Sequence, residues 1–386
     1  MLFTLFKVKA NKEENMSYEK LFENNISSES VKAWKASGKK AVGYVCCHVP
    51  TEIFLAADVM PVRLRATGCV NSSDSEAWMS SFSCSYAKSV LQYLMNGTYH
   101  LDGLVQSDGC MMATRILDNW EHIAKKNGKS QFIHQIGAPR ITNDATIDYY
   151  KSELQEFVDK LGEFSGTKVT DEALKAAAAK TNEVRDLISQ LFELRMEAKV
   201  SGTDALRIML ANCDLTIDEY ITALKEFLAD AKNRKPIEAR VRLMMIGSAL
   251  DNPEYIKVIE EKGGLVVADA LCFGANAFGD KIVVDDSDVL GSIAKHYLNR
   301  HVCPRSLDNR PAIHKEIIDT CKAYKVQGVV YEKMQNCECW GGEAYYLEPD
   351  LKAAGIPMLQ VEREEQMANA GQLAIRAEAF VEMLEK

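Results

Sequence analysis

The distribution of apolar residues along the chain predicts short buried strands that alternate with helices. Short apolar runs bounded by turn signals are typical of strands that are covered on both faces. They lie at residues 41–45, 104–106, 132–136, 241–246, 265–268, 328–331 and 358–361. Because buried strands that alternate with helices form parallel sheets, we expect an α/β fold.

The stretches between these runs have the apolar spacing of helices. They cover residues 52–59, 85–95, 111–125, 254–262, 289–298, 312–324 and 372–384. Between residues 147 and 229 the helical spacing persists without a strand-like run, and Gly166 interrupts it. The α/β pattern restarts at Lys235-Pro236.

This layout predicts two Rossmann-like parallel-sheet domains with a helical connection between them. The expected parts are an N-terminal helical or linker segment at 1–40, a first α/β domain at 41–145, the helical connection at 146–235, and a second α/β domain at 236–386. The length of 386 residues agrees with this division, since it exceeds what one ordinary core supports.

Charge and hydropathy exclude two classes of partner. The chain carries 46 basic and 55 acidic residues, a formal net charge of -9, whereas nucleic-acid binders usually show a basic excess. No apolar run approaches the roughly 18 residues that a membrane span needs. We therefore expect a cytoplasmic protein that binds neither nucleic acid nor membrane.

Eleven cysteines are many for a cytoplasmic chain, and their odd number argues against a disulfide framework. Most of them follow predicted strands, at the carboxyl edge of a parallel sheet where ligands bind. These are Cys46 and Cys47 after 41–45, Cys110 after 104–106, Cys272 after 265–268, and Cys337 and Cys339 after 328–331. Cys84 and Cys110 also open predicted helices, whose positive dipole end favours the thiolate that binds iron.

The residues alone leave two interpretations of these cysteines open. No C-x-x-C pair is present, so the cysteines form either a dispersed iron site or unrelated buried thiols. Cys213 and Cys321 lie on apolar helical stretches and are predicted to be core residues, and Cys69 lies in a Ser-rich loop. The chain has no H-x-x-x-H pair, G-x-x-x-x-G-K-[ST] loop or G-x-S-x-G elbow.

At these cysteines the chain resembles the small-subunit (beta or D-component) branch of the 2-hydroxyacyl-CoA dehydratase and benzoyl-CoA reductase family. The resemblance runs from about residue 38 to the C-terminus. The segments that carry it are GYVCCHVPTEIFLAADVMPVRL (43–64), SFSCSYAKSVLQYLMNGTYHLDGLV (81–105), CMMATRILDNW (110–120), VVADALCFGANAF (266–278), HVCPRS (301–306), GVVYEKMQNCECW (328–340), YLEPDLKAAGIPMLQVE (346–362) and GQLAIRAEAFVEML (371–384).

The resemblance implies a [4Fe–4S] cluster held by Cys84 in SFSCSYAKS, Cys110 in GCMMATR and Cys337 in KMQNCEC. Cys339 competes as a ligand, because this chain has Cys337-Glu338-Cys339 where relatives commonly have C-D.

Further cysteines extend the set. Cys46 or Cys47, beside the P-x-E motif of Pro50 and Glu52, can cap the fourth iron. A related branch carries a double-cubane cluster that needs six cysteines. Cys46, Cys272 and Cys303 would complete that number, although a cysteine expected between Cys84 and Cys110 is absent.

The activity implied by the resemblance is an oxygen-sensitive, radical elimination of water from a 2-hydroxyacyl-CoA. One electron on the thioester carbonyl makes a ketyl, which expels the α-hydroxyl and acidifies the β-hydrogen, and an enoyl-CoA leaves. The implied partners are a larger homologous subunit, an ATP-hydrolysing iron–sulfur activator and the acyl-CoA. Three alternatives remain: a benzoyl-CoA reductase-type subunit, a double-cubane reductase, and a non-catalytic electron relay or scaffold.

Overall fold

The computed structural model describes residues 17–386 except 24, 25, 27, 301, 302 and 368. Residues 1–16 of the predicted segment 1–40, and the first two residues of HVCPRS, therefore lie outside the described residues. In the described part of that segment, η1 (Ser17–Phe22) and α1 (Glu29–Ala36) precede the first sheet.

The first sheet has four parallel strands, in the order β2-β1-β3-β4. They are β1 (Ala41–Tyr44), β2 (Met60–Arg63), β3 (Gly103–Ser107) and β4 (Phe132–Ile136). The helices between them are α2 (Thr51–Ala56), α3 (Ser73–Glu76), α4 (Ser85–Met95) and α5 (Met111–Lys126). Strand β2 was not predicted, because it is only four residues long and contains Pro61. It forms an edge of the sheet, where a proline is tolerated.

The second sheet repeats the topology of the first, with the order β6-β5-β7-β8 and all strands parallel. Its strands are β5 (Val241–Gly247), β6 (Gly264–Leu271), β7 (Gly328–Met334) and β8 (Met358–Arg363). Strand β6 is buried along its whole length, as expected for a parallel strand covered on both faces. Two four-stranded parallel sheets confirm the predicted α/β class and are consistent with two Rossmann-like units.

Each strand order places a switch point in the middle of its sheet. From β1 the chain passes to β2 on one side, and β3 then lies on the other side of β1. The second sheet does the same at β5 and β7. In open α/β sheets ligands bind beyond the carboxyl ends of the strands at such a point. The loops that follow β1, β3, β5 and β7 are therefore the expected position of a site.

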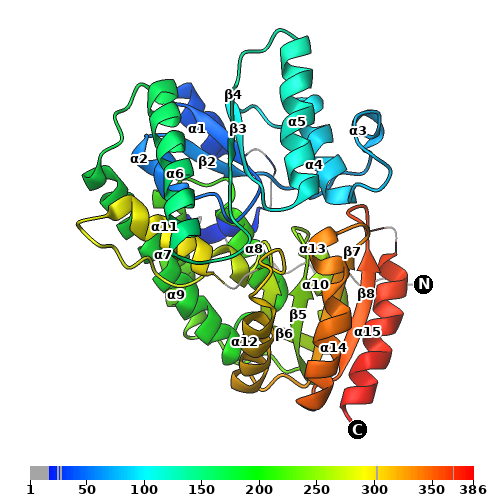
Figure 1. The fold of residues 1–386 in the computed structure, drawn as a ribbon. Coiled ribbons are helices and arrows are strands. Elements are labelled where there is room, and N and C mark those ends of the chain that lie inside the picture. Colours follow the sequence, from blue (N-terminus) through cyan, green and yellow to red (C-terminus); the bar gives the residue numbers. More distant parts are fainter. Residues whose placement is uncertain (1–16, 24–25, 27, 301–302, 368) are drawn as a thin grey trace.

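The predicted helical connection consists of four helices between the two sheets. They are α6 (Asp144–Ser165), α7 (Asp171–Met196), α8 (Gly202–Ala211) and α9 (Ile217–Ala231). Gly166 ends α6 in a left-handed conformation with φ of 75°, which explains the break in the apolar spacing. Figure 1 shows these helices, in green, beside both sheets.

The helices of the second half do not all cover the second sheet. They are α10 (Glu254–Glu260), η2 (Ala275–Ala277), α11 (Val289–Asn299), α12 (Arg310–Ala323), α13 (Glu338–Gly341), α14 (Glu343–Ala353) and α15 (Ala370–Leu384). Helix α11 packs against α6 and α7, in the same buried cluster as residues of β1 and α2. The chain thus returns to the first unit between β6 and β7. Helix α14 was not predicted, since Pro349 interrupts its pattern.

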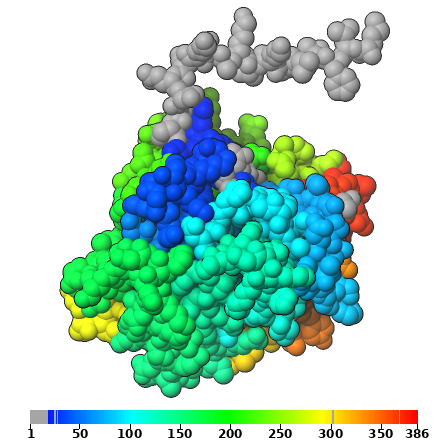
Figure 2. All heavy atoms as spheres, turned by 90° about the horizontal axis from the view of Figure 1, so that it is seen from above, coloured from blue at the N-terminus to red at the C-terminus, as the bar shows by residue number. Residues whose placement is uncertain are grey.

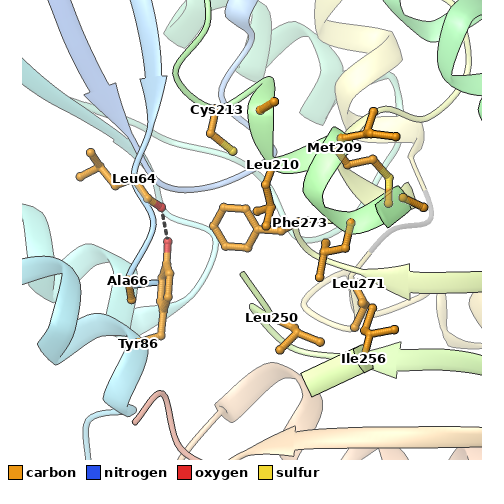
Figure 3. Packing of buried hydrophobic residues seen from close by; sticks show 14 of the residues in the cluster. Leu64, Ala66, Tyr86, Met209, Leu210, Cys213, Leu250, Ile256, Leu271 and Phe273 are labelled. Carbon is orange, nitrogen blue, oxygen red and sulfur yellow. Dashed lines mark hydrogen bonds between the residues drawn. The ribbon is translucent and has the colours of Figure 1, made fainter. Parts of the chain in front are cut away.

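A continuous core joins the two units. In Figure 3 the ring of Phe273 lies among Leu210 of α8, Leu271 of β6 and Tyr86 of α4. Tyr86 meets Phe273 edge to face at 5.9 Å between ring centroids, and its hydroxyl donates to Leu64 O at 2.8 Å. Figure 2 shows one face of the molecule, where residues of the first half cover most of the surface and α15 reaches the rim. None of the described helices combines the length and the hydropathy of a membrane span.

Candidate functional site

The three predicted cluster ligands each lie immediately before a helix. Cys84 is the N-cap of α4, Cys110 the N-cap of α5, and Cys337 the N-cap of α13. This confirms that helices begin after Cys84 and Cys110, as the sequence predicts. Cys110 follows β3, an inner strand of the first sheet, and Cys337 follows β7, the corresponding strand of the second sheet. Both residues therefore lie at the switch points of their sheets.

The three side chains are close enough to act on one another. Burial raises the pKa of Cys84 to about 12, and the charge of Cys110 adds to this rise. Burial also raises the pKa of Cys337, with contributions from Cys84 and Cys110. The structure therefore brings together the three residues that the resemblance singled out, although they are far apart in sequence.

Cys339 belongs to the same group. Its thiol hydrogen-bonds to Cys110 and Cys303, and these contacts raise the pKa of Cys339. Hydrogen bonding from Cys339 lowers the pKa of Cys110, while burial opposes this effect and the Ala113 N–H supports it. The Ala113 N–H lies 3.4 Å from the Cys110 sulfur. Cys339 thus shares the Cys337 loop and contacts a second predicted ligand.

Cys46 and Cys47 also interact with members of this group. A hydrogen bond to Cys47 and burial raise the pKa of Cys46, and the same contact lowers the pKa of Cys47. A Cβ atom placed on Gly109 would lie 2.5 Å from the Cys46 sulfur, so only glycine allows this approach directly before Cys110. Cys272 is half-buried, burial raises its pKa, and it interacts with Cys303, Cys337 and Cys46.

Eight cysteines are therefore linked, and the remaining three lie elsewhere. The linked ones, called the cysteine group below, are Cys46, Cys47, Cys84, Cys110, Cys272, Cys303, Cys337 and Cys339. Cys213 and Cys321 are 4% and 1% exposed and lie in hydrophobic clusters, as predicted. Cys69 is buried, and its sulfur lies 3.4 Å from Asn71 O.

Two arginines near Cys303, Arg300 and Arg305, hold loops of the cysteine group by hydrogen bonds to backbone carbonyls. Arg305 donates to Gly109 O at 3.1 Å and to Ala138 O at 2.5 Å, so it holds the loops after β3 and β4. Arg300 donates to Cys47 O at 3.2 Å. These two arginines were not predicted to be supporting residues. Their position in RHVCPR, on both sides of a cysteine, was the available signal.

A series of buried polar side chains connects the Cys337 loop to the helix after Cys84. Ser248, which follows β5, donates to Glu332 at 3.1 Å and accepts from Met334 N at 3.2 Å. The Arg363 guanidinium forms two ion pairs, one with the Glu332 carboxylate at 2.7 Å and one with the Glu365 carboxylate at 3.3 Å. The backbone N–H of Glu365 then donates to Ser85 Oγ at 2.9 Å. This network was not predicted, although opposite charges within the paired strands β7 and β8 were a visible signal.

The P-x-E motif has a structural role. Glu52 is fully buried and forms an ion pair with Arg185 at 3.0 Å. Burial alone would raise the pKa of Glu52, but Arg185, Thr181 and Tyr297 hold it below its usual value. The Tyr297 hydroxyl donates to Glu52 at 2.8 Å, so the motif ties α2 to α7 and α11.

The donor set determines which cofactor the group can hold. Among the residues that the structure describes, no three His, Cys, Asp or Glu side chains meet closely enough to bind a single metal ion. A [4Fe–4S] cluster differs from a single ion, because each cysteine binds a different iron at the corner of a cubane. Half-buried to buried thiols at helix starts, which would release protons on binding iron, fit such a cluster.

A family model described as "2-hydroxyglutaryl-CoA dehydratase, D-component" matches residues 46–384. The chain belongs to this family. The match includes the whole cysteine group and both sheets except β1.

The curated relatives within this family are distant but cover nearly the full chain. The beta subunit of (R)-phenyllactyl-CoA dehydratase from Clostridium sporogenes is 22% identical over 92% of this chain and 94% of that protein. The beta subunit of (R)-2-hydroxyglutaryl-CoA dehydratase from Acidaminococcus fermentans is 24% identical over 91% and 94%. One of the subunits of benzoyl-CoA reductase from Thauera aromatica is 24% identical over 83% and 84%. The family thus includes both dehydratase and reductase subunits.

Proposed function

We propose that this chain is the iron–sulfur subunit of an oxygen-sensitive 2-hydroxyacyl-CoA dehydratase. In this proposal Cys84, Cys110 and Cys337 hold a [4Fe–4S] cluster between the two sheets. The observation that supports it most strongly is the convergence of these three thiols, each at a helix start, in a chain of the dehydratase family. Three protein ligands leave one iron for another group.

The cluster would supply single electrons at low potential to the thioester carbonyl of a 2-hydroxyacyl-CoA. The role of this chain's residues is to hold the ligands and exclude water. Arg305 fixes the backbone before Cys110, and Arg363 and Glu332 fix the strand ends beside Cys337. Because the charged members of these contacts are buried, we expect the backbone before Cys110 and the strand ends beside Cys337 to be rigid.

The proposal includes two protein partners. Relatives named beta subunits belong to enzymes of more than one subunit, so we expect a larger homologous subunit beside this chain. We also expect an ATP-hydrolysing iron–sulfur activator, because electrons of such low potential need an energy source. The acyl-CoA would bind to this assembly.

Electron accounting tests the proposed reaction. The chain, its larger partner and the activator would be mixed anaerobically with ATP, a reductant and either a 2-hydroxyacyl-CoA or benzoyl-CoA. A dehydratase returns the electron after each turnover, so we expect many enoyl-CoA molecules for each electron supplied. Consumption of reductant in proportion to product, with benzoyl-CoA as substrate, would establish a reductase instead. If the chain is only a relay or scaffold, the partner alone would bind the CoA ester and this chain alone would not.

The additional cysteines favour one second candidate, a double-cubane reductase. Cys46, Cys272 and Cys303 interact with the proposed ligands, which brings the number near the site to at least six. A double-cubane would bind about eight irons per chain instead of about four. In that case Cys272→Ala and Cys303→Ala would lower the iron content as much as Cys110→Ala does. The single-cluster proposal expects these two variants to keep their iron.

The carboxylate between Cys337 and Cys339 provides a further test. Glu338 Oε1 accepts a hydrogen bond at 2.8 Å from the N–H of Met111, the residue after Cys110, and so joins two ligand loops. We expect Glu338→Ala to lose iron to a chelator about fivefold faster, since one helix-capping contact contributes about 1 kcal/mol. Glu348→Ala, an exposed glutamate on α14, is the control. Equal iron-release rates for both variants and the parent protein would contradict this role.

A further inference from the structure

A pocket lies beside the cysteine group, on the side of Cys47. Its volume is about 450 Å³, within the range of small-molecule sites. Most of its lining is apolar and comes from α2, α7, the segment between α8 and α9, and the segment after β6. Tyr44, Arg63 and Cys47 also line it, from the carboxyl ends of β1 and β2 and the loop after β1. The pocket therefore opens at a sheet edge where ligands are expected.

Arg63 differs from the other buried arginines of the described chain. It is 6% exposed, its Nε has no hydrogen-bond partner, and no carboxylate of the described residues forms an ion pair with it. Each of the six others contacts a carboxylate or a backbone carbonyl: Arg65 with Asp214, Arg185 with Glu52, Arg195 with Asp269, Arg300 with Cys47 O, Arg305 with Gly109 O and Arg363 with Glu332. Burying a charge without a partner costs free energy, because the charge loses its hydration. An anion bound at Arg63 would offset this desolvation cost.

The position of Arg63 is fixed by its neighbours. Its guanidinium lies 4.1 Å from the centre of the Phe273 ring, which packs in the core between the two units. Tyr44 is its partner in the strand register, one strand away. A stacked guanidinium leaves its edge free for a planar, bidentate partner such as a carboxylate.

The charges around the pocket define the ligand further. Lys39 pairs with Asp58 at 2.9 Å, and Lys180 pairs with Asp218 at 2.7 Å. Arg185 is neutralised by Glu52. Among the lining residues that the structure describes, Arg63 is then the single unbalanced cation, which favours a ligand with one negative charge over a polyphosphate.

We propose that this pocket binds a small apolar monocarboxylate, with its carboxylate on Arg63 and its apolar body against the aliphatic lining. The carboxylate can belong to a free acid or to the far end of an acyl chain on CoA. The pocket shares Cys47 with the cysteine group, but none of the three proposed ligands Cys84, Cys110 and Cys337 lines it.

Calorimetric titration of the full anaerobically reconstituted chain tests the site. The probes are hexanoate, its neutral match hexanamide, and glutaryl-CoA, whose acyl chain ends in a carboxylate. We expect hexanoate to bind and hexanamide to bind much more weakly. Comparison with glutaryl-CoA distinguishes the two sources: tighter binding than hexanoate assigns the carboxylate to an acyl-CoA, and weaker binding assigns it to a free acid.

Variants of the pocket complete the test. Arg63→Gln should weaken hexanoate binding about 10- to 100-fold, because it removes a charge-assisted hydrogen bond, and Arg63→Lys should weaken it less. Lys180→Gln, a paired cation of the same pocket, should bind as the parent does. Equal binding of hexanoate and hexanamide, no hexanoate binding, or unchanged binding by Arg63→Gln would overturn the proposal. Iron loss in Arg63→Gln would also overturn it, since Arg63 would then serve the cysteine group.

Discussion

Cys84→Ala, Cys110→Ala and Cys337→Ala should each lose most of the iron that the anaerobically reconstituted parent protein holds. Each removes one of three proposed thiolate ligands, and the remaining two hold a cubane much less firmly than three. We expect the brown colour and the dehydratase turnover to disappear together. Iron and sulfide assays, with circular dichroism as a check of folding, measure the effect.

Matched cysteines in the core control this experiment. Cys213→Ala and Cys321→Ala remove buried thiols that lie in hydrophobic clusters, and burial is the main cause of the raised pKa of each thiol. Both variants should keep their iron. Iron loss of the same size in all five variants would mean that the ligands are assigned wrongly. Iron loss in Cys339→Ala but not in Cys337→Ala would mean that Cys339, and not Cys337, is the third ligand.

Arg195→Ala should lower the free energy of unfolding by about 3–5 kcal/mol, the usual cost of breaking a buried ion pair. Arg195 is 1% exposed and lies 2.6 Å from Asp269, which is equally buried in β6. Asp269 also accepts from Ala275 N at 2.7 Å, so it shapes the turn that carries Cys272. Truncation of Arg195 leaves the Asp269 charge without its partner. Urea titration followed by circular dichroism measures the loss.

Two comparisons separate the buried pair from ordinary surface charge. Lys180 lies on α7, as Arg195 does, and forms an ion pair with Asp218 of α9. Because both side chains of this pair are largely exposed, Lys180→Ala should lower the free energy of unfolding by at most about 1 kcal/mol. Adding Asp269→Asn to Arg195→Met should recover part of the stability, because no unpaired charge then remains buried. Equal losses of unfolding free energy in Arg195→Ala and Lys180→Ala would show that the buried ion pair stabilises the fold no more than the exposed one.

The sequence predicted the sheets well, because buried parallel strands are encoded locally as short apolar runs. Seven of the strands lie where apolar runs lie, and Gly166 separates α6 from α7 as expected. Strand β2 escaped prediction because Pro61 opposes a strand locally, and only its position at the sheet edge makes it acceptable. The return of α11 to the first unit was equally hidden, since an amphipathic helix does not specify which surface covers it.

The cysteine group was predictable in part. Strand ends and helix starts indicated where Cys84, Cys110 and Cys337 stand, but not that Cys303 and Cys339 would contact each other. The supporting arginines and the Ser248–Glu332–Arg363 contacts depend on pairings between distant segments, which apolar spacing does not encode. The same holds for Arg63, whose significance is the absence of a carboxylate partner among the described residues.

The central claim is that this chain of the dehydratase family holds one [4Fe–4S] cluster on Cys84, Cys110 and Cys337. The most direct test is to count iron and acid-labile sulfide in the full-length protein after anaerobic reconstitution, together with its visible absorption. The proposal predicts a brown protein with about four irons and about four sulfides per chain. A colourless, folded protein without bound iron would contradict it.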